Sequence, residues 1–157
     1  MKQLWAPWRM EYILANKIDG CFFCIKMREN RDRENYILYR AESNFVIMNV
    51  YPYNTGHLLV VPYKHSGRME DLTREEMGEH LAVVNLSMMA LKKAFQAQGF
   101  NIGMNIGKVA GAGVEDHLHT HIVPRWEGDT NYMPVLADVK VMPEALSMTY
   151  DKLKDFF

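Results

Sequence analysis

The chain has 157 residues and a formal net charge of −1, a size that fits one domain with its own buried core. The near-neutral charge indicates no general polyanion-binding surface, so we expect no nucleic-acid partner. No apolar run approaches the ~20 residues of a membrane span, and the N-terminus has no apolar signal segment. We therefore expect a cytoplasmic protein that does not contact membranes.

The only two cysteines, Cys21 and Cys24, are spaced C-x-x-C near the N-terminus. In a cytoplasmic protein this spacing indicates half of a metal site or a redox pair rather than a structural disulfide. No thioredoxin-like βαβ pattern surrounds the pair, which disfavours redox chemistry, and a metal-free pair is a third alternative. The polar stretch that follows, residues 26–35, is predicted to be a solvated surface connection.

Three short segments rich in β-branched, aromatic and other apolar residues come next, at 36–40, 44–50 and 57–62. A three-residue link separates the first two, and Pro52 with the Asn-Thr-Gly turn at 54–56 separates the second and third. This pattern predicts an antiparallel meander.

The clearest helix is predicted over residues 74–98. Thr73 and Glu76 form a T-x-x-E capping box at its start, and Gly99 is the expected C′ residue. His80 lies inside this helix, and the sequence assigns it no role. An apolar stripe at alternating steps of four and three is predicted to face the core; its members are Met77, Leu81, Val84, Met88, Leu91 and Phe95.

Two more strands and a terminal helix complete the pattern. The strands are predicted at 100–107 and 117–124, with a Gly-rich loop at 108–116 between them. Residues 142–157 are amphipathic, and Pro143 suits the first turn of a helix. Strands, one long helix, strands and a terminal helix together predict an α+β fold with an antiparallel sheet.

Half of the six histidines stand at every second position in H-L-H-T-H-I-V, as His117, His119 and His121. In a strand they share one face, and the residues between them face the core. Three imidazoles on one face are costly unless they hold a metal, an anion or a proton network. Three exposed surface histidines are the alternative that implies no function.

Two chemistries fit such a histidine face. The three imidazoles could hold one catalytic metal ion. Alternatively, one neutral imidazole could attack phosphorus and form a covalent phosphoramidate, while its neighbours stabilise charge on the phosphoryl oxygens. The preceding Gly-rich loop favours the second, because glycines let backbone N–H groups approach an anion closely.

The H-L-H-T-H-I-V segment resembles the signature of the histidine triad family, His-x-His-x-His followed by two apolar residues. N-V-Y-P-Y-N-T-G-H-L-L-V-V-P, at 49–62, is similar to the family's other conserved segment, and the long capped helix lies between the two. The resemblance covers roughly residues 36–125. The stretches at 4–13, 51–63 and 121–133 are similar to the bacterial branch of diadenosine tetraphosphate phosphorylases or hydrolases.

The resemblance implies a HIT-like fold for a single domain over residues 1–157: an antiparallel five-stranded sheet with one long helix and a C-terminal helix. Within it, residues 1–35 are an N-terminal arm that contains the Cys pair, 36–126 the core and 127–157 an extension. The family also implies a twofold homodimer in which two sheets join.

By the same resemblance, His119 is the nucleophile that cleaves a dinucleoside polyphosphate, such as diadenosine tetraphosphate, at an α-phosphate. It would carry the nucleotidyl group until water or inorganic phosphate releases it. His121 and His57 match positions that contact phosphate oxygens or the leaving side. Adenine nucleotides are the expected ligands, without an organic cofactor. The alternatives are a nucleoside phosphoramidate hydrolase of the purine nucleotide-binding kind and a non-catalytic nucleotide-binding module.

The residues expected to contact the substrate are Asn49, Asn105, Gly111, Gly113, Val114 and Trp126. Asn49 matches the position that holds ribose hydroxyls, with local backbone satisfaction as the alternative. Asn105 matches a polar position before the loop, although its spacing to the triad is one residue longer than usual. The loop at 111–116 lacks the family's usual hydroxyl, so its backbone N–H groups are expected to hold the phosphate alone. Trp126, like Trp5 and Trp8, is expected to stack on a base or to pack against a partner subunit.

Several branches of the family hold zinc with two cysteines, a histidine after the second conserved strand and the first histidine of the triad. In this chain those positions are Cys21, Cys24, His65 and His117. Four protein ligands leave no coordination position open, so the implied zinc site is structural and ties the N-terminal segment to the sheet.

Overall fold

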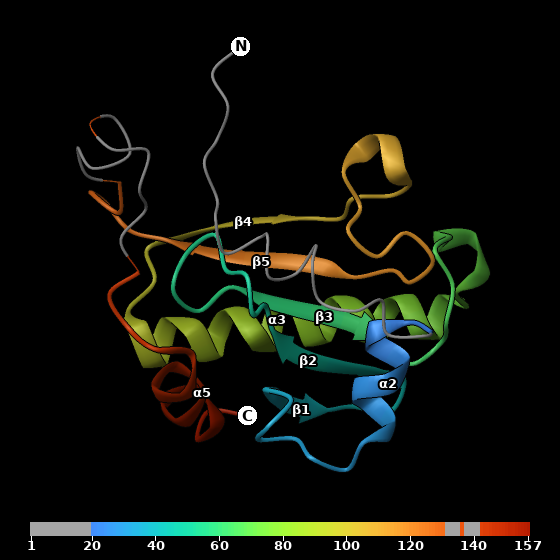
Figure 1. The fold of residues 1–157 in the computed structure, drawn as a ribbon, viewed down its shortest axis with the longest axis horizontal. Helices are drawn as coiled ribbons and strands as arrows, with labels where there is room; N and C mark the ends of the chain where they lie inside the picture. Colours follow the sequence, from blue (N-terminus) through green and yellow to red (C-terminus); the bar gives the residue numbers. More distant parts are fainter. Residues whose placement is uncertain (1–19, 131–135, 137–141) are drawn as a thin grey trace.

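A computed structural model describes residues 20–130, 136 and 142–157. The helices are α2 (Phe22–Arg28), α3 (Arg74–Phe95) and α5 (Leu146–Lys154), with 3-10 turns η1 (Met69–Asp71) and η2 (Lys108–Ala110). The strands are β1 (Ile37–Arg40), β2 (Asn44–Met48), β3 (Leu58–Pro62), β4 (Gly99–Gly103) and β5 (Thr120–Arg125). They form one antiparallel sheet in the order β1-β2-β3-β5-β4 (Figure 1), which confirms the predicted fold class. In the described part of the chain, no helix is long and apolar enough to cross a membrane.

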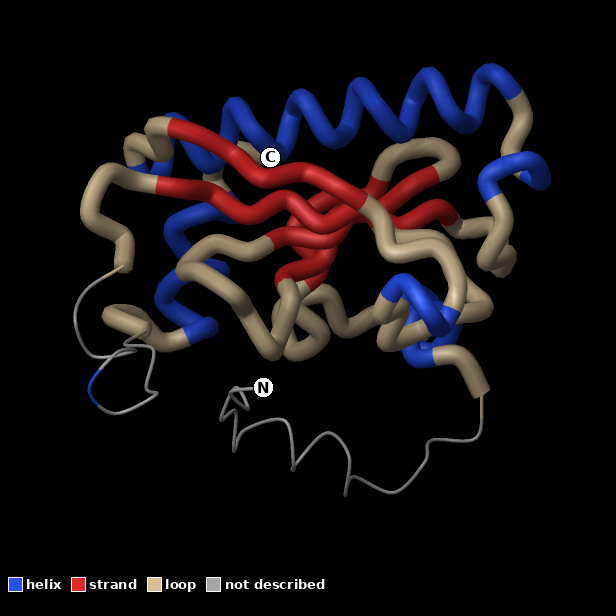
Figure 2. Tube along the Cα trace, turned by 90° about the horizontal axis from the view of Figure 1, so that it is seen from above, coloured by secondary structure: helices blue, strands red, loops and turns tan. Residues whose placement is uncertain are grey.

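The sheet buries a core on each of its faces. Helices α3 and α5 cover one face, and α3 runs along its length (Figure 2). This α3-side core includes Leu38, Val46, Met48, Leu58, Val60, Val84, Leu91, Ile122 and Leu153. The α2-side core, on the opposite face, consists of Phe23, Ile37, Phe45, Ile47, Leu59 and Val61. Because side chains alternate along a strand, a residue's position in β3 or β5 decides which core it faces.

Helix α3 begins as predicted and ends earlier. The Glu76 N–H donates to Thr73 Oγ1 (3.1 Å) and the Thr73 N–H to Glu76 Oε2 (2.8 Å), which confirms the capping box. The predicted end at residue 98 is wrong, because Gln96 takes a left-handed conformation (φ 53°) that closes the helix at Phe95. The N–H of Gln98 already donates to the carbonyl of Arg125 (3.0 Å), and Gly99 is the first residue of β4 rather than a helix cap.

The predicted apolar stripe of α3 is only partly correct. Leu81 is 68% exposed and Met77 36% exposed, whereas Val84 and Leu91 are buried. The face that packs on the sheet instead holds smaller and more polar side chains, and its buried residues are His80, Val83, Val84, Ser87, Ala90 and Leu91. The helix is therefore rotated from the orientation that the large apolar residues alone predict.

Three other boundaries also differ from expectation. The stretch at 26–35 is not wholly a solvated connection, because its first residues finish α2 and Asn35 is 6% exposed. Strand β4 ends at Gly103, well before residue 107. Pro143 precedes α5 rather than lying in its first turn: the helix starts at Leu146, and the Glu144 carboxylate accepts a hydrogen bond from the Thr149 hydroxyl (2.9 Å).

Candidate active site and metal centre

The histidine motif lies at the start of β5 rather than wholly within it. The strand was expected to begin at residue 117 but begins at Thr120, so His117 and His119 precede it and only His121 is a strand residue. Leu118, Thr120 and Ile122 are buried, as predicted. His121 pairs with Leu59 of β3, which points its side chain to the α2 side of the sheet.

His119 is buried, and one of its ring nitrogens is already committed. The side chain is 6% exposed and lies under the Phe23 ring of α2, with 5.1 Å between ring centroids. Its Nδ1–H donates to the backbone carbonyl of His117 (2.9 Å). Because burial lowers the pKa of His119, the ring is neutral near pH 7 and Nε2 carries a lone pair instead of a proton.

His57 and His121 form a hydrogen-bonded pair whose protons can be placed from their partners. The backbone N–H of Tyr53 donates to His57 Nδ1 (3.1 Å), so the ring proton of His57 is on Nε2. That Nε2–H donates to His121 Nδ1 (2.9 Å), which places the proton of His121 on its own Nε2. Burial lowers the pKa of His121 to about 4, so this ring is a neutral hydrogen-bond donor near pH 7.

The loop that carries His57 explains the Gly-His pair. Gly56 has φ +78°, a backbone conformation that favours glycine, and an added Cβ would lie 2.9 Å from Leu91 Cδ2, which would have to shift. The N–H of His57 donates to the Asn54 carbonyl (3.1 Å), and the carbonyl of His57 accepts from the Asn49 N–H (2.9 Å). His57 is thereby held at both its backbone groups.

The predicted substrate-binding residues surround the histidines unequally. Asn49 Nδ2 lies 3.3 Å from His57 Nδ1, and its Oδ1 accepts the Tyr51 N–H (2.9 Å), the local satisfaction considered as the alternative. Asn105 donates to the carbonyl of Gly111 (3.5 Å), so it braces the Gly-rich loop. Within that loop Gly111 and Gly113 are exposed, whereas Val114 packs on the α2-side core.

Trp126 lies away from the histidines. Its indole N–H donates to the carbonyl of Phe95 (2.9 Å), and its ring packs against the α3-side core. The indole thus satisfies the carbonyl of the last residue of α3. Its position gives no support to the expectation that Trp126 stacks on a base in the site. Trp5 and Trp8 lie outside the described residues.

Two aromatic residues of the site were not predicted. Phe23 is 2% exposed and contacts His119 and also His117, whose ring centroid is 5.4 Å away. Tyr53 is 49% exposed, with its ring stacked on His121 (6.0 Å, 15° between planes) and tilted against His57 (4.7 Å). The pair Phe22-Phe23 between the two cysteines was a sequence signal that this segment packs against the sheet. No sequence signal indicated that Tyr53 would contact the histidines.

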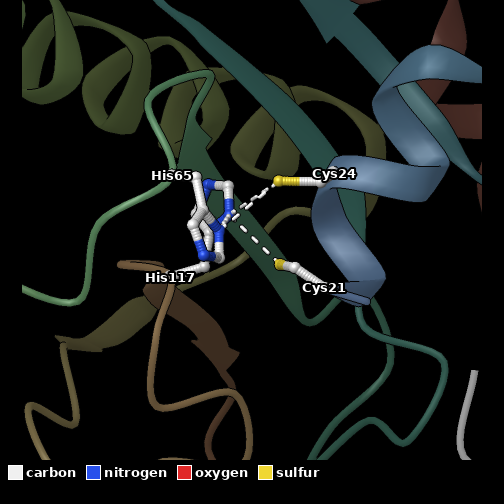
Figure 3. Close-up of side chains that lie close together, drawn as sticks. All are labelled: Cys21, Cys24, His65 and His117. Atoms are coloured by element: carbon white, nitrogen blue, oxygen red, sulfur yellow. Dashed lines mark hydrogen bonds between the residues drawn. The ribbon is translucent and has the colours of Figure 1, made fainter. Parts of the chain in front are cut away.

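The four predicted metal ligands converge. Cys21 and Cys24 come from the start of α2, His65 from the loop after β3 and His117 from the loop before β5 (Figure 3). Their ligand atoms all lie within 4.8 Å of one another. His117 Nδ1 lies 3.3 Å from Cys21 Sγ, 3.6 Å from Cys24 Sγ and 3.3 Å from His65 Nδ1, and Cys24 Sγ lies 3.4 Å from His65 Nδ1.

These separations fit a tetrahedral metal ion. Zinc bonds of ~2.3 Å to sulfur and ~2.0 Å to nitrogen place S and N ligands about 3.5 Å apart and two N ligands about 3.3 Å apart. The Nε2–H of His117 donates to the Pro62 carbonyl (2.7 Å), which leaves the Nδ1 lone pair for the centre. Burial and the adjacent Cys21 raise the pKa of the Cys24 thiol, so a nearby cation would be needed to hold this sulfur as a thiolate near pH 7.

The histidine face itself does not form a second metal site. Within residues 20–130, 136 and 142–157, the cluster of Cys21, Cys24, His65 and His117 is the only group of three or more such ligands that lies this close together. His57 and His121 are hydrogen-bonded to each other instead. The catalytic-metal alternative therefore has no support in this geometry.

Comparison with known proteins agrees with the fold and identifies the family. The HIT domain family profile matches residues 30–128. An AP-4-A phosphorylase of Mycobacterium tuberculosis is 34% identical over 157 residues, covering 95% of this chain and 80% of that protein. A Zn-bound histidine triad family protein from Mycobacterium smegmatis has a TM-score of 0.70 at 27% identity, covering 87% of this chain and 92% of its own. A hypothetical histidine triad nucleotide-binding protein from Sulfolobus tokodaii gives 0.68 at 34% identity, covering 87% and 88%. The chain therefore belongs to the HIT family.

Proposed function

We propose that the protein cleaves dinucleoside polyphosphates of the diadenosine tetraphosphate type at an α-phosphate, through a covalent nucleotidyl-His119 intermediate. The observation that carries this proposal is the hydrogen bond from His119 Nδ1–H to the His117 carbonyl (2.9 Å). It leaves Nε2 as the unprotonated nitrogen of a buried, neutral ring, which is the state that a nitrogen nucleophile requires.

In the first step, the Nε2 lone pair of His119 attacks the α-phosphorus. The N–P bond forms as the bond to the bridging oxygen breaks, and the remaining nucleoside polyphosphate leaves with that electron pair. The imidazole now carries a positive charge, and the His117 carbonyl stabilises it by accepting the Nδ1–H. A polyphosphate leaves as an anion and needs no proton, which suits a site whose His121 is neutral.

In the second step, an incoming oxygen attacks the same phosphorus and the N–P bond breaks, returning neutral His119. Water loses a proton and gives the nucleoside monophosphate. Inorganic phosphate gives the nucleoside diphosphate. The protein named AP-4-A phosphorylase, 34% identical to this chain, supports both the class of substrate and the phosphorolytic route.

His121 and His57 take different parts in this scheme. The Nε2–H of His121 donates to an oxygen of the transferred phosphoryl group, where charge develops in the transition state. His57 acts through His121, because its Nε2–H is donated to His121 Nδ1 and fixes the tautomer of that ring. Asn49, Asn105 and the N–H groups of the Gly111–Val114 loop keep their predicted roles as substrate contacts.

The test is a substrate panel with and without inorganic phosphate. With diadenosine tetraphosphate, ATP and ADP in the presence of phosphate indicate phosphorolysis, whereas ATP and AMP without it indicate hydrolysis. An adenosine phosphoramidate tests the neighbouring hydrolase activity. We expect His119→Ala and His119→Asn to remain folded by circular dichroism and to lose at least about 10³-fold in kcat. Turnover by His119→Ala, or binding without turnover by the unmodified protein, would contradict the proposal.

We also propose that the Cys21, Cys24, His65 and His117 cluster holds a structural zinc ion. The ligand spacing supports it, and the Mycobacterium smegmatis relative is a Zn-bound protein. A bound zinc would tie α2, and with it Phe23, to the loops that follow β3 and precede β5. Elemental analysis is expected to find one zinc per chain, and Cys21→Ser to lower both that content and the melting temperature. Full zinc content in Cys21→Ser would contradict the site. The homodimer and the cytoplasmic location implied by the resemblance stay predictions.

A further inference from the structure

A buried polar network connects α3 to the histidine motif from behind. His80, which the sequence left without a role, is 3% exposed inside the α3-side core. Its Nδ1 lies 2.7 Å from Asn44 Oδ1 at the start of β2, and its Nε2 lies 2.6 Å from the hydroxyl of Thr120 at the start of β5. Asn44 and Thr120 are also buried, at 1% and 4% exposed. The imidazole therefore spans two strands that are separated by β3.

The direction of every hydrogen bond in this network can be worked out. The carboxylate of Glu79 accepts from Asn44 Nδ2 (2.7 Å) and from the N–H of Ser43 (2.8 Å), so Asn44 presents its Oδ1 to His80. His80 must then donate through Nδ1. Burial lowers the pKa of His80 to about 4, against an opposing effect of Glu79, so the ring is neutral. Its Nε2 accordingly accepts the hydroxyl proton of Thr120.

The polar network contacts the histidine motif at Thr120, where the backbone pairing of β5 with its neighbouring strands ends. The β3–β5 ladder ends with Val60 opposite Thr120, and the β4–β5 ladder ends with Gly103 opposite His121. His119 is one residue beyond the last pair. It lies between two anchors: the Leu118 N–H donated to the Ser66 carbonyl (2.7 Å) and the Thr120 side chain donated to His80.

We infer that His80 is a positioning residue for His119, acting through the Thr120 hydroxyl that it fixes at the end of the β5 ladder. The inference rests on the proposed function in that His119 is taken as the nucleophile. His80 never reaches the substrate, because it lies on the α3 side of the sheet while His119 lies under Phe23 on the α2 side. Its contribution is to keep the start of β5 from moving while His119 attacks.

Stability alone does not account for such a network. Buried polar groups in a core are commonly no more stabilising than apolar side chains of similar volume, and their removal one partner at a time is costly. A chain of polar groups whose far end is bonded to the residue next to the nucleophile has a further use, because misplacement of reacting atoms by about 1 Å costs roughly 10²-fold in rate.

Two substitutions at Thr120 and a control substitution test whether the Thr120 hydroxyl positions His119. Thr120→Val keeps the shape and removes the hydroxyl, whereas Thr120→Ser keeps the hydroxyl. We expect Thr120→Val to lower kcat roughly tenfold to a hundredfold with KM changed less than about twofold, and Thr120→Ser to retain most of kcat. Ser87→Ala is the matched control: Ser87 is 0% exposed on the same helix face, and its hydroxyl donates to the Val83 carbonyl (2.8 Å) within α3. It should leave kcat unchanged.

The double variant His80→Leu with Thr120→Val separates positioning from stability, and it serves if Thr120→Val alone does not fold. The apolar pair avoids the unpaired His80 Nε2 that Thr120→Val alone leaves, while Asn44 Oδ1 loses its His80 donor, so we expect the melting temperature to recover in part while kcat stays low. ¹⁵N NMR of the His119 ring, which requires no turnover, is expected to show a mixture of tautomers or exchange broadening in the double variant and one tautomer in the unmodified protein. Full kcat in a stable double variant, an unchanged His119 spectrum, or an equal kcat loss in Ser87→Ala would each overturn the inference. Inactivity of the unmodified protein would count against the proposed function instead.

Discussion

Acid pH should destabilise the protein through His80, by an amount that the structure specifies. The pKa of His80 is lowered from 6.5 to about 4 by burial. The unfolded chain therefore takes up this proton at a higher pH than the folded chain does, and the free energy of unfolding falls as the pH falls from about 6.5 to about 4. A difference of this size corresponds to about 3 kcal/mol over the whole interval, of which about 2 kcal/mol is lost by pH 5.

A His80→Gln variant isolates this contribution. An amide can keep a donor toward Asn44 and an acceptor toward Thr120, but it does not titrate. Burial also lowers the pKa of His121 to about 4, and that group titrates in both proteins and cancels in the comparison. Glu79, whose own pKa is lowered, affects both proteins only at still lower pH.

The measurement is urea unfolding of both proteins at pH 8, 7, 6 and 5, with the same zinc content throughout. We expect the stability advantage of the unmodified protein over His80→Gln to shrink by about 2 kcal/mol between pH 8 and pH 5. A difference that stays constant over this range would show that His80 titrates normally in the folded state. The hydrogen-bond directions assigned to Asn44 and Thr120 would then be wrong as well.

Two further predictions concern the loops of the site. A Cβ at Gly67 would lie 2.3 Å from the Glu115 carbonyl oxygen, so Gly67→Ala must separate the loops that carry His65 and His117, two of the proposed zinc ligands. We expect a loss of roughly tenfold or more in zinc affinity in a chelator competition, whereas Gly78→Ala, which meets nothing within 4 Å, should bind normally; equal affinities would refute the argument. Removing the Tyr53 ring from its stack on His121 admits water, so Tyr53→Ala should raise the pKa of His121 from about 4 in an NMR titration. An unchanged pKa of His121 would mean that groups other than the Tyr53 ring exclude water from this imidazole.

Features with a local physical cause were predictable from the sequence. The Thr73–Glu76 capping box was confirmed because both of its partners are three residues apart and need no distant contact. The strands at β1, β2 and β3 appeared within a few residues of their expected bounds, since their β-branched runs are flanked by turns. The family resemblance supplied the metal set, and the structure brings those four side chains together.

The orientation of α3 was less predictable, because its large apolar residues do not all lie on one face. Met77, Leu81 and Met89 are exposed, at 36%, 68% and 47%, while the small Ala90 and the polar Ser87 are buried. Periodicity weights a leucine above a serine or a histidine, so the predicted stripe was drawn through Leu81 and passed over His80. Burial of His80 depends on Asn44 and Thr120, which satisfy both of its ring nitrogens and lie far from it in the sequence.

A sequence motif does not determine which ring nitrogen of each histidine carries the proton. The motif presents its three histidines as equivalent, yet each has a different hydrogen-bond partner. The Pro62 carbonyl fixes the proton of His117 on Nε2, and the His117 carbonyl fixes that of His119 on Nδ1. His57 donates to Nδ1 of His121, so the proton of His121 lies on Nε2. Two of these partners come from β3 and the loop before it, more than fifty residues away in the chain. Because His117 directs its side chain toward the other three proposed zinc ligands and its carbonyl toward His119, the proposed nucleophile, a single residue joins the two candidate sites. Loss of the proposed zinc is thus expected to reach His119 through the backbone of one shared residue, before any wider unfolding.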